Sequence, residues 1–194
     1  MGREIPAAAD LPVPEYDDVK AFDVLDRIVR ETLRIRPPLV QVMRKVITPI
    51  AVPNTNYVIP AGNYIVASPV ASATDEKYYT NAEDWVPSRW GAGEGDGEDG
   101  QDKATTDYGF GATTTSARSP MLPFGAGRHR CIGEQFAYLQ IKTILYVLLS
   151  RFEFSLDPKR GMPERNYNSM VMLPEGPALC RYKRRAGSST SSAA

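Results

Sequence analysis

The sequence is poor in the residues that build disulfide frameworks and zinc sites. Its 194 residues include two cysteines, Cys131 and Cys180, and a single histidine, His129. Two cysteines imply no disulfide framework, and their scarcity favours a reducing compartment. A lone cysteine in a turn cannot complete a four-ligand zinc site. The composition therefore points away from both disulfide-rich scaffolds and structural zinc modules.

An excess of charge and a long apolar run are also missing. Lys plus Arg and Asp plus Glu both number 23, so the formal net charge is zero and nothing indicates nucleic acid as a partner. The longest apolar run in the main helical pattern, Ile144 to Leu149, is far too short to span a bilayer. Residues 1–6 do not resemble a signal peptide.

The hydrophobic pattern predicts a mainly α chain with small β hairpins. An apolar stripe that starts after Asp17 or Asp18 predicts a helix ending before Pro37, because proline lacks a backbone N–H and restricts its predecessor. A more apolar pattern over 136–152 predicts a second, largely buried helix.

Turn residues predict where the β hairpins lie. After a strand-like segment at 40–47, segments 57–59 and 64–66 flank Pro60-Ala61-Gly62, which favours a hairpin turn. A second hairpin is expected over 170–182, with its turn at Pro174-Glu175-Gly176-Pro177. We expect one domain over 1–186, with an acidic, glycine-rich insertion at 91–103 and a disordered tail at 187–194.

The chemistry is concentrated in residues 124–133, FGAGRHRCIG. The glycines permit a tight turn and the close approach of a flat ligand. The start of the following helix, together with Arg128 and Arg130, favours the thiolate form of Cys131, which is the form that binds metals. An exposed single thiolate suits the fifth ligand of an iron held by a macrocycle. The plainer alternative is a buried structural cysteine in a turn before a helix.

The pattern Phe-x-x-Gly-x-(Arg/His)-x-Cys-x-Gly resembles the haem-binding loop of the cytochrome P450 family. The resemblance implies the C-terminal haem-binding portion of the mixed cytochrome P450 fold, haem b as cofactor, and Cys131 as its axial ligand within a loop that includes Phe124 and Gly125. It also implies that His129, where most members have arginine, and Arg44 bind the haem propionates. Both residues also fit an ordinary solvent-facing role.

The pair Glu31 and Arg34 lies three residues apart on the first predicted helix, so the two side chains share a face. Alone, such a pair is usually a solvated surface contact. Residues 85–90, WVPSRW, resemble the family segment that adds a second arginine, although the family usually has Phe at the position of Trp85. The resemblance therefore implies a buried structural cluster of Glu31, Arg34 and Arg89, which locks the loop before the cysteine.

Residues 54–60, 133–138 and 169–174 resemble one branch of the family, the fungal sterol 14α-demethylases. That branch implies oxidative removal of the sterol 14α-methyl group in ergosterol biosynthesis, with electrons from NADPH through cytochrome P450 reductase. It further implies an endoplasmic reticulum membrane location through an N-terminal anchor. The residues implied to face the sterol, which would equally suit a core, are Leu39, Val40, Gln41, Met43 and Met170.

Two alternatives to this assignment stay open. Val40-Gln41 stands where the fungal enzymes commonly have His-Ser, which allows a monooxygenase with another substrate. Complete family members are also much longer, and the resemblance places the anchor, most of the substrate cavity and the distal oxygen-activating helix outside these residues. A truncated, non-catalytic fragment is therefore the second alternative.

Overall fold

The computed structural model describes residues 14–91, 105–107, 112–114, 120–157, 159, 163–169 and 171–185. Within these ranges the helices are α1 (Tyr16–Lys20), α2 (Asp23–Ile35), α3 (Pro69–Ala73) and α4 (Glu134–Arg151), with 3₁₀ turns η1 (Pro87–Trp90) and η2 (Gly127–His129). The strands form antiparallel pairs, as the predicted fold class requires. The pairs are β1 (Val42–Lys45) with β4 (Tyr64–Ala67), β2 (Ile50–Ala51) with β3 (Val58–Ile59), β5 (Thr105–Asp107) with β6 (Ala112–Thr114), β7 (Phe152–Leu156) with β10 (Cys180–Arg184), and β8 (Arg165–Asn166) with β9 (Leu173–Pro174).

Two predicted segments and one predicted residue fall outside these ranges. They are the acidic insertion beyond Gly91, the tail at 187–194, and Met170. No helix in the described part of the chain has the length and apolar character needed to cross a membrane.

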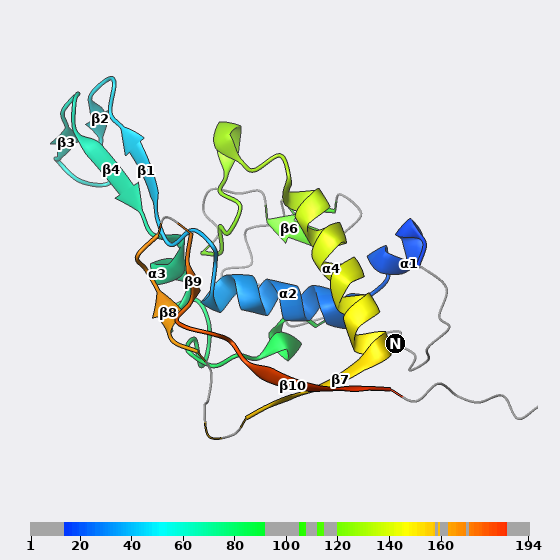
Figure 1. Cartoon of the computed structure of the whole chain (residues 1–194). Coiled ribbons are helices and arrows are strands. Elements are labelled where there is room, and N and C mark those ends of the chain that lie inside the picture. The colour runs from blue at the N-terminus through cyan, green and yellow to red at the C-terminus, as the bar shows by residue number, and fades with distance from the viewer. Residues whose placement is uncertain are drawn as a thin grey trace, which may run out of the picture.

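Helices α2 and α4 cross at the centre of the structure and hold its core (Figure 1). Val19, Phe22 and Leu25 from the α1–α2 region pack against Tyr146 of α4, and the rings of Phe22 and Tyr146 stack with centroids 5.0 Å apart. Val29 contributes to a second buried cluster further along α2. Because α4 begins just after the cysteine loop, this crossing fixes the direction in which the loop enters the helix.

The single helix expected from Asp17 or Asp18 is wrong at one point, because the chain breaks between α1 and α2. The break lies at Ala21 and Phe22, and Phe22 leaves helical geometry at φ −76° and ψ 76°. Its buried ring fills the core beside α4, so tertiary packing overrides local helix propensity. The helical N-cap is Glu15, whose backbone N–H is bound by the side chain of Asp18 in a capping box.

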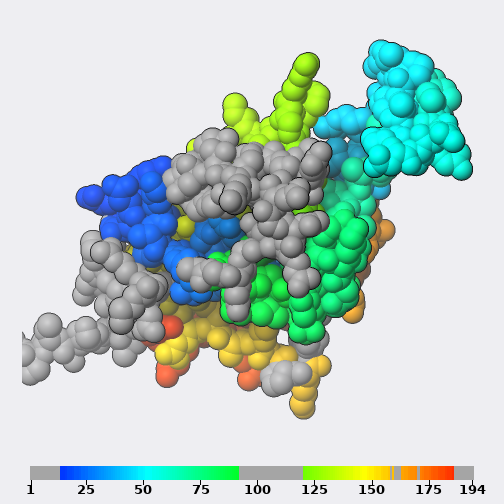
Figure 2. All heavy atoms as spheres, turned by 180° about the vertical axis from the view of Figure 1, so that it is seen from behind, coloured from blue at the N-terminus to red at the C-terminus, as the bar shows by residue number. Residues whose placement is uncertain are grey.

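Both predicted hairpin pairings are wrong, although the turns themselves are present. β3 pairs with β2 and β4 pairs with β1, so 57–59 and 64–66 are not partners. In the same way β9 pairs with β8, and β10 pairs with β7. Gly62 and Gly176 adopt φ 90° and 68°, the left-handed region that glycine tolerates. Turn residues fix where the chain reverses, but longer-range hydrogen bonds decide which strands pair. The resulting β1–β4 and β2–β3 unit projects from the body of the molecule (Figures 1 and 2).

The burial predicted for the second helix is wrong. On α4, Phe136 is 66% exposed and Ile144 is 50% exposed. Lys142 of α4 pairs with Asp26 of α2 at 3.2 Å, so a charged contact forms part of this interface. Leu139 and Leu145 also pack there but are only partly buried. The buried stripe of α4 consists of Glu134, Tyr138, Lys142, Tyr146 and Ser150.

Candidate functional site

The cysteine loop is a tight turn that leaves the thiol of Cys131 exposed. Gly125 and Gly127 have φ 73° and 64°, a conformation that side chains disfavour. The backbone N–H of Gly125 donates to the carbonyl of Leu122 at 3.0 Å, and that of Cys131 donates to the carbonyl of Phe124 at 2.9 Å. The sulfur is therefore accessible while the backbone that carries it is held in place.

The surroundings of the sulfur are formed by Gly133 and the start of α4. A Cβ on Gly133 would lie 3.8 Å from Cys131 Sγ, so the glycine leaves the space beside the sulfur open. Gly133 also caps α4, whose positive dipole end lies close by in sequence. Among the described residues, no group of three or more His, Cys, Asp or Glu side chains could hold a metal ion.

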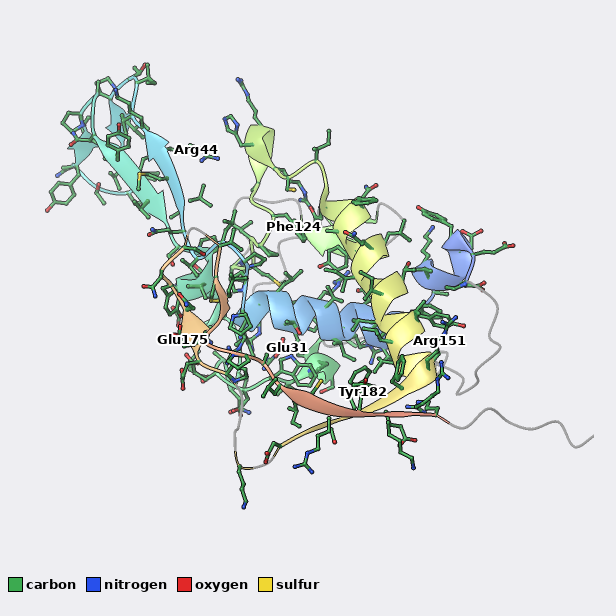
Figure 3. The ribbon with its side chains drawn as sticks, in the orientation of Figure 1. Glu31, Arg44, Phe124, Arg151, Glu175 and Tyr182 are labelled. Atoms are coloured by element: carbon green, nitrogen blue, oxygen red, sulfur yellow. The ribbon has the colours of Figure 1, made fainter. Side chains whose placement is uncertain are left out.

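The two residues expected to bind propionates lie on different elements. His129 is exposed on η2, next to the equally exposed Arg128. Arg44 is exposed on β1, where its Nη1 donates to the carbonyl of Met43 at 2.8 Å. Figure 3 shows Arg44 on the projecting β unit and Phe124 inside the body of the molecule. The structure thus keeps both candidate donors at the surface, on elements far apart in the sequence.

The segments expected to face the substrate meet through a backbone contact. The N–H of Met172 donates to the carbonyl of Pro38 at 2.7 Å, which joins the 171–174 segment to the one that starts at Leu39. Leu39 and Met43 are exposed, as is Gln41, while Val40 is half-buried. Exposure of these apolar side chains is compatible with a ligand-facing role and does not support the alternative that they form a core.

Glu31 and Arg34 form a completely buried ion pair on α2, labelled at Glu31 in Figure 3. Arg34 Nε and Nη2 donate to the two carboxylate oxygens of Glu31, each at 2.9 Å. Arg34 also donates to the carbonyls of Ala73, Ala82 and Asp84 at 2.6–2.9 Å. The pair therefore ties α2 to the long connection that follows α3.

Arg89 joins this cluster, together with groups that the sequence did not reveal. Arg89 Nε donates to Glu31 Oε1 at 3.0 Å, and Trp90 Nε1 donates to Glu31 Oε2 at 2.9 Å. The N–H of Val86 donates to the same carboxylate at 2.8 Å. The buried Tyr79 ring lies 5.1 Å from the Arg34 guanidinium and 5.9 Å from that of Arg89. The aromatic residues around Arg89 were the only sequence signal for these partners.

The electrostatics of Glu31 follow from these contacts. Burial raises the pKa of Glu31, but the hydrogen bonds from Arg34, Val86, Arg89 and Trp90 outweigh it and hold the pKa below the ordinary value of 4.5. Glu31 is therefore ionised at neutral pH and acts as the fixed centre of the cluster.

A second ion pair lies at the cysteine loop, and the sequence argument did not assign it. Arg130 Nε donates to Glu134 Oε2 at 2.7 Å. Burial raises the pKa of Glu134, although the charges of Arg130 and Arg30 act in the opposite direction. The spacing of four residues was the signal that could have revealed this pair.

Comparison with known proteins identifies the family. A model of the Cytochrome P450 family matches residues 4–181. The chain belongs to the cytochrome P450 family. The resemblance noted in the cysteine loop is thereby confirmed over most of the chain, and family membership implies a haem-iron cofactor.

Relatives of this cytochrome P450 include fungal sterol demethylases. It is 44% identical over 171 residues to lanosterol 14-alpha demethylase of Schizosaccharomyces pombe, covering 88% of this chain and 34% of the relative. It is 42% identical over 176 residues to sterol 14-alpha demethylase of Gibberella zeae, covering 90% and 34%. Lanosterol 14-alpha demethylase of Cunninghamella elegans is 45% identical over 172 residues, covering 86% and 33%. The chain spans about a third of the length of these relatives.

Proposed function

We propose that this cytochrome P450 is a haem-thiolate monooxygenase of the sterol 14α-demethylase type. The observation that carries the proposal is the exposed thiol of Cys131 in a loop whose backbone is held by the carbonyl of Phe124. Relatives at 42–45% identity that are named sterol or lanosterol 14-alpha demethylases support the substrate class. The reaction is oxidative removal of the sterol 14α-methyl group.

The loop residues would hold haem b. Cys131 would be the axial ligand, with Phe124 and Gly125 forming the loop against the macrocycle. His129 and Arg44 are N–H donors suited to the propionate carboxylates. The haem supplies oxygen activation, which an axial thiolate favours.

The buried cluster has a structural part in this proposal. Glu31 receives donors from Arg34, Arg89 and Trp90, so it fixes the connection between α3 and η1 against α2. That role is to hold the frame on which α4 and the cysteine loop rest, and the cluster takes no part in the chemistry. Glu31, Arg34 and Arg89 are therefore proposed as structural residues, not catalytic ones.

The partners follow from the same proposal. The monooxygenase would draw electrons from NADPH through cytochrome P450 reductase at the endoplasmic reticulum membrane. The exposed Arg128 and His129 beside the cysteine are compatible with an acidic protein surface docking there. The organic substrate would be a flat, apolar sterol that meets the exposed Leu39 and Met43.

Replacing Cys131 with alanine should abolish the thiolate signature of the haem-loaded protein. The reduced, carbon-monoxide-bound form should show the red-shifted Soret band of thiolate ligation, and Cys131→Ala should lose it. The matched control is Cys180→Ser, because Cys180 is also a free, exposed thiol but lies on β10. Retention of the band in Cys131→Ala, or its absence from the unaltered haem-loaded protein, would contradict the proposal.

Lanosterol should bind the haem-loaded protein and perturb its haem absorption, whereas cholesterol, which lacks the 14α-methyl group, should bind more weakly. The second candidate function, a monooxygenase with another substrate, is favoured by Val40-Gln41, since this pair departs from the branch pattern. Equal responses to both sterols would reject the demethylase assignment, whereas a response to neither would favour the alternative of a non-catalytic fragment. The Cys131 test reports haem ligation separately from this sterol preference.

A further inference from the structure

The cysteine loop enters α4 through a buried carboxylate. Glu134 is 8% exposed and is the first residue of α4. Arg130, which directly precedes the cysteine, brings both Nε and Nη2 to within 2.7 Å of Glu134 Oε2. Hydrogen bonds between charged groups are shorter and stronger than neutral ones. The contact therefore restrains the loop immediately next to Cys131.

A charge on α2 also acts on the same carboxylate. The charge of Arg30, on α2, stabilises the ionised form of Glu134. Arg30 is itself held, because its Nε lies 2.7 Å from Asp26 Oδ2 and its guanidinium lies 5.9 Å from the centre of the Trp90 ring. Glu134 is thus bound by an arginine of the loop, and the charge of an arginine on the central helix favours its ionised form.

A second link reaches the loop from the next turn of α4. Tyr138 is buried, and its ring centre is 5.8 Å from that of Phe124. The carbonyl of Phe124 accepts the hydrogen bond from the N–H of Cys131. An aromatic contact and an ion pair, one turn apart on α4, therefore converge on the backbone that carries the thiol.

We propose that Glu134 is a positioning residue for Cys131, which holds the cysteine loop against the start of α4 by binding Arg130. The consequence for haem ligation rests on the proposed function. The restraint on the loop is independent of the proposed function, because it concerns contacts within the chain. Glu134 acts through Arg130 and the loop backbone, so its role is distinct from that of the proposed ligand.

The alternative is an ordinary helix-surface pair. Pairs spaced by four residues on an exposed helix restrain little, because solvent screens them and both side chains stay mobile. The chain offers such a pair for comparison in Asp23 and Arg27 of α2, whose side chains are 46% and 30% exposed. The corresponding values for Glu134 and Arg130 are 10% and 18%.

Amide hydrogen exchange in the haem-free protein tests the restraint directly. Glu134→Gln keeps the shape of the side chain and removes its charge. We expect exchange of the Cys131 amide to become about tenfold faster or more, because a charge-assisted contact next to it is lost. Amides of the β7–β10 pair should keep their protection. Asp23→Asn should change Cys131 exchange by less than about twofold, since it breaks an exposed pair on α2.

A double-mutant cycle links the effect to the proposed contact. Arg130→Gln should also speed exchange of the Cys131 amide. In the double variant that carries both substitutions, the acceleration of exchange should be smaller than the product of the two single accelerations. If Glu134→Gln changes exchange of the Cys131 amide no more than Asp23→Asn does, the positioning role is wrong. It is also wrong if Glu134→Gln lowers amide protection equally over the whole chain.

A spectroscopic arm connects the restraint to haem. In the reduced, carbon-monoxide-bound protein, Glu134→Gln should retain haem while part of the thiolate band is replaced by the band of a non-thiolate form. An unchanged thiolate fraction would reject the consequence for ligation. A protein that takes up no haem would reject the proposed function, while the exchange experiment would still decide whether Glu134 restrains the loop.

Discussion

Glu31→Gln should lower the free energy of unfolding by about 3–5 kcal/mol, the usual cost of breaking a buried ion pair. The substitution keeps the size of the side chain but removes the charge that faces Arg34, and both residues are 0% exposed. Arg34 would keep its carbonyl partners but remain as a buried charge without a counter-ion. Arg89 and Trp90 would lose their ionised acceptor at the same time. Urea unfolding at neutral pH measures the change.

The pH dependence gives the same variant a second signature. The folded-state pKa of Glu31 lies below 4.5, so ionised Glu31 contributes stability that is fully present above the unfolded-state value and is lost as pH falls through the folded value. The difference in urea midpoint between the unaltered protein and Glu31→Gln should therefore be constant near pH 7 and shrink below about pH 4.5.

The control for this prediction is Glu83→Gln, since Glu83 is exposed on the connection that the cluster holds. It should leave the urea midpoint unchanged at every pH tested. If Glu31→Gln and Glu83→Gln change the urea midpoint by the same amount, the stability of the cluster does not depend on the charge of Glu31.

The cluster shows how far sequence could lead. A spacing of three on a helix brings Glu31 and Arg34 onto one face, and resemblance supplied Arg89 as an expected partner. The amide of Val86 and the indole of Trp90 could not be predicted, because they arrive from more than fifty residues away through an irregular connection. Local periodicity carries no information about how such a connection returns to the helix.

The strands and α4 show the same limit in a different form. The turn at Gly62 was predicted correctly. The strands on either side of it, β3 and β4, were expected to pair with each other, but β3 pairs with β2 and β4 pairs with β1. On α4, apolar residues surround the helix, so composition could not indicate which side faces α2. That side is defined by the contact of Lys142 with Asp26 and by the packing of Tyr138 and Tyr146 in the two core clusters.

Asp26→Asn should also cost about 3–5 kcal/mol, because it strands the charge of Lys142 between α2 and α4. Lys142 is completely buried, and its Nζ lies 3.2 Å from Asp26 Oδ1 and 3.5 Å from the carbonyl of Lys20. Within the described part of the chain Asp26 Oδ1 makes no aligned hydrogen bond, so its contact with Lys142 is held by charge. Asparagine keeps the shape of the side chain and removes that charge. The urea midpoint and the unfolding slope measure the loss.

Lys142→Met tests whether the loss comes from the stranded charge or from the shape of the interface. Alone it should cost much less than Asp26→Asn, because Asp26 keeps Arg30 as a counter-ion at 2.7 Å. Combined with Asp26→Asn it should recover most of the lost stability, since an apolar side chain of similar length then replaces the buried charge. Strictly additive losses in the double variant would show instead that packing, and not the ion pair, holds α2 against α4. The crossing that carries the cysteine loop would then depend on the apolar cores around Phe22 and Val29.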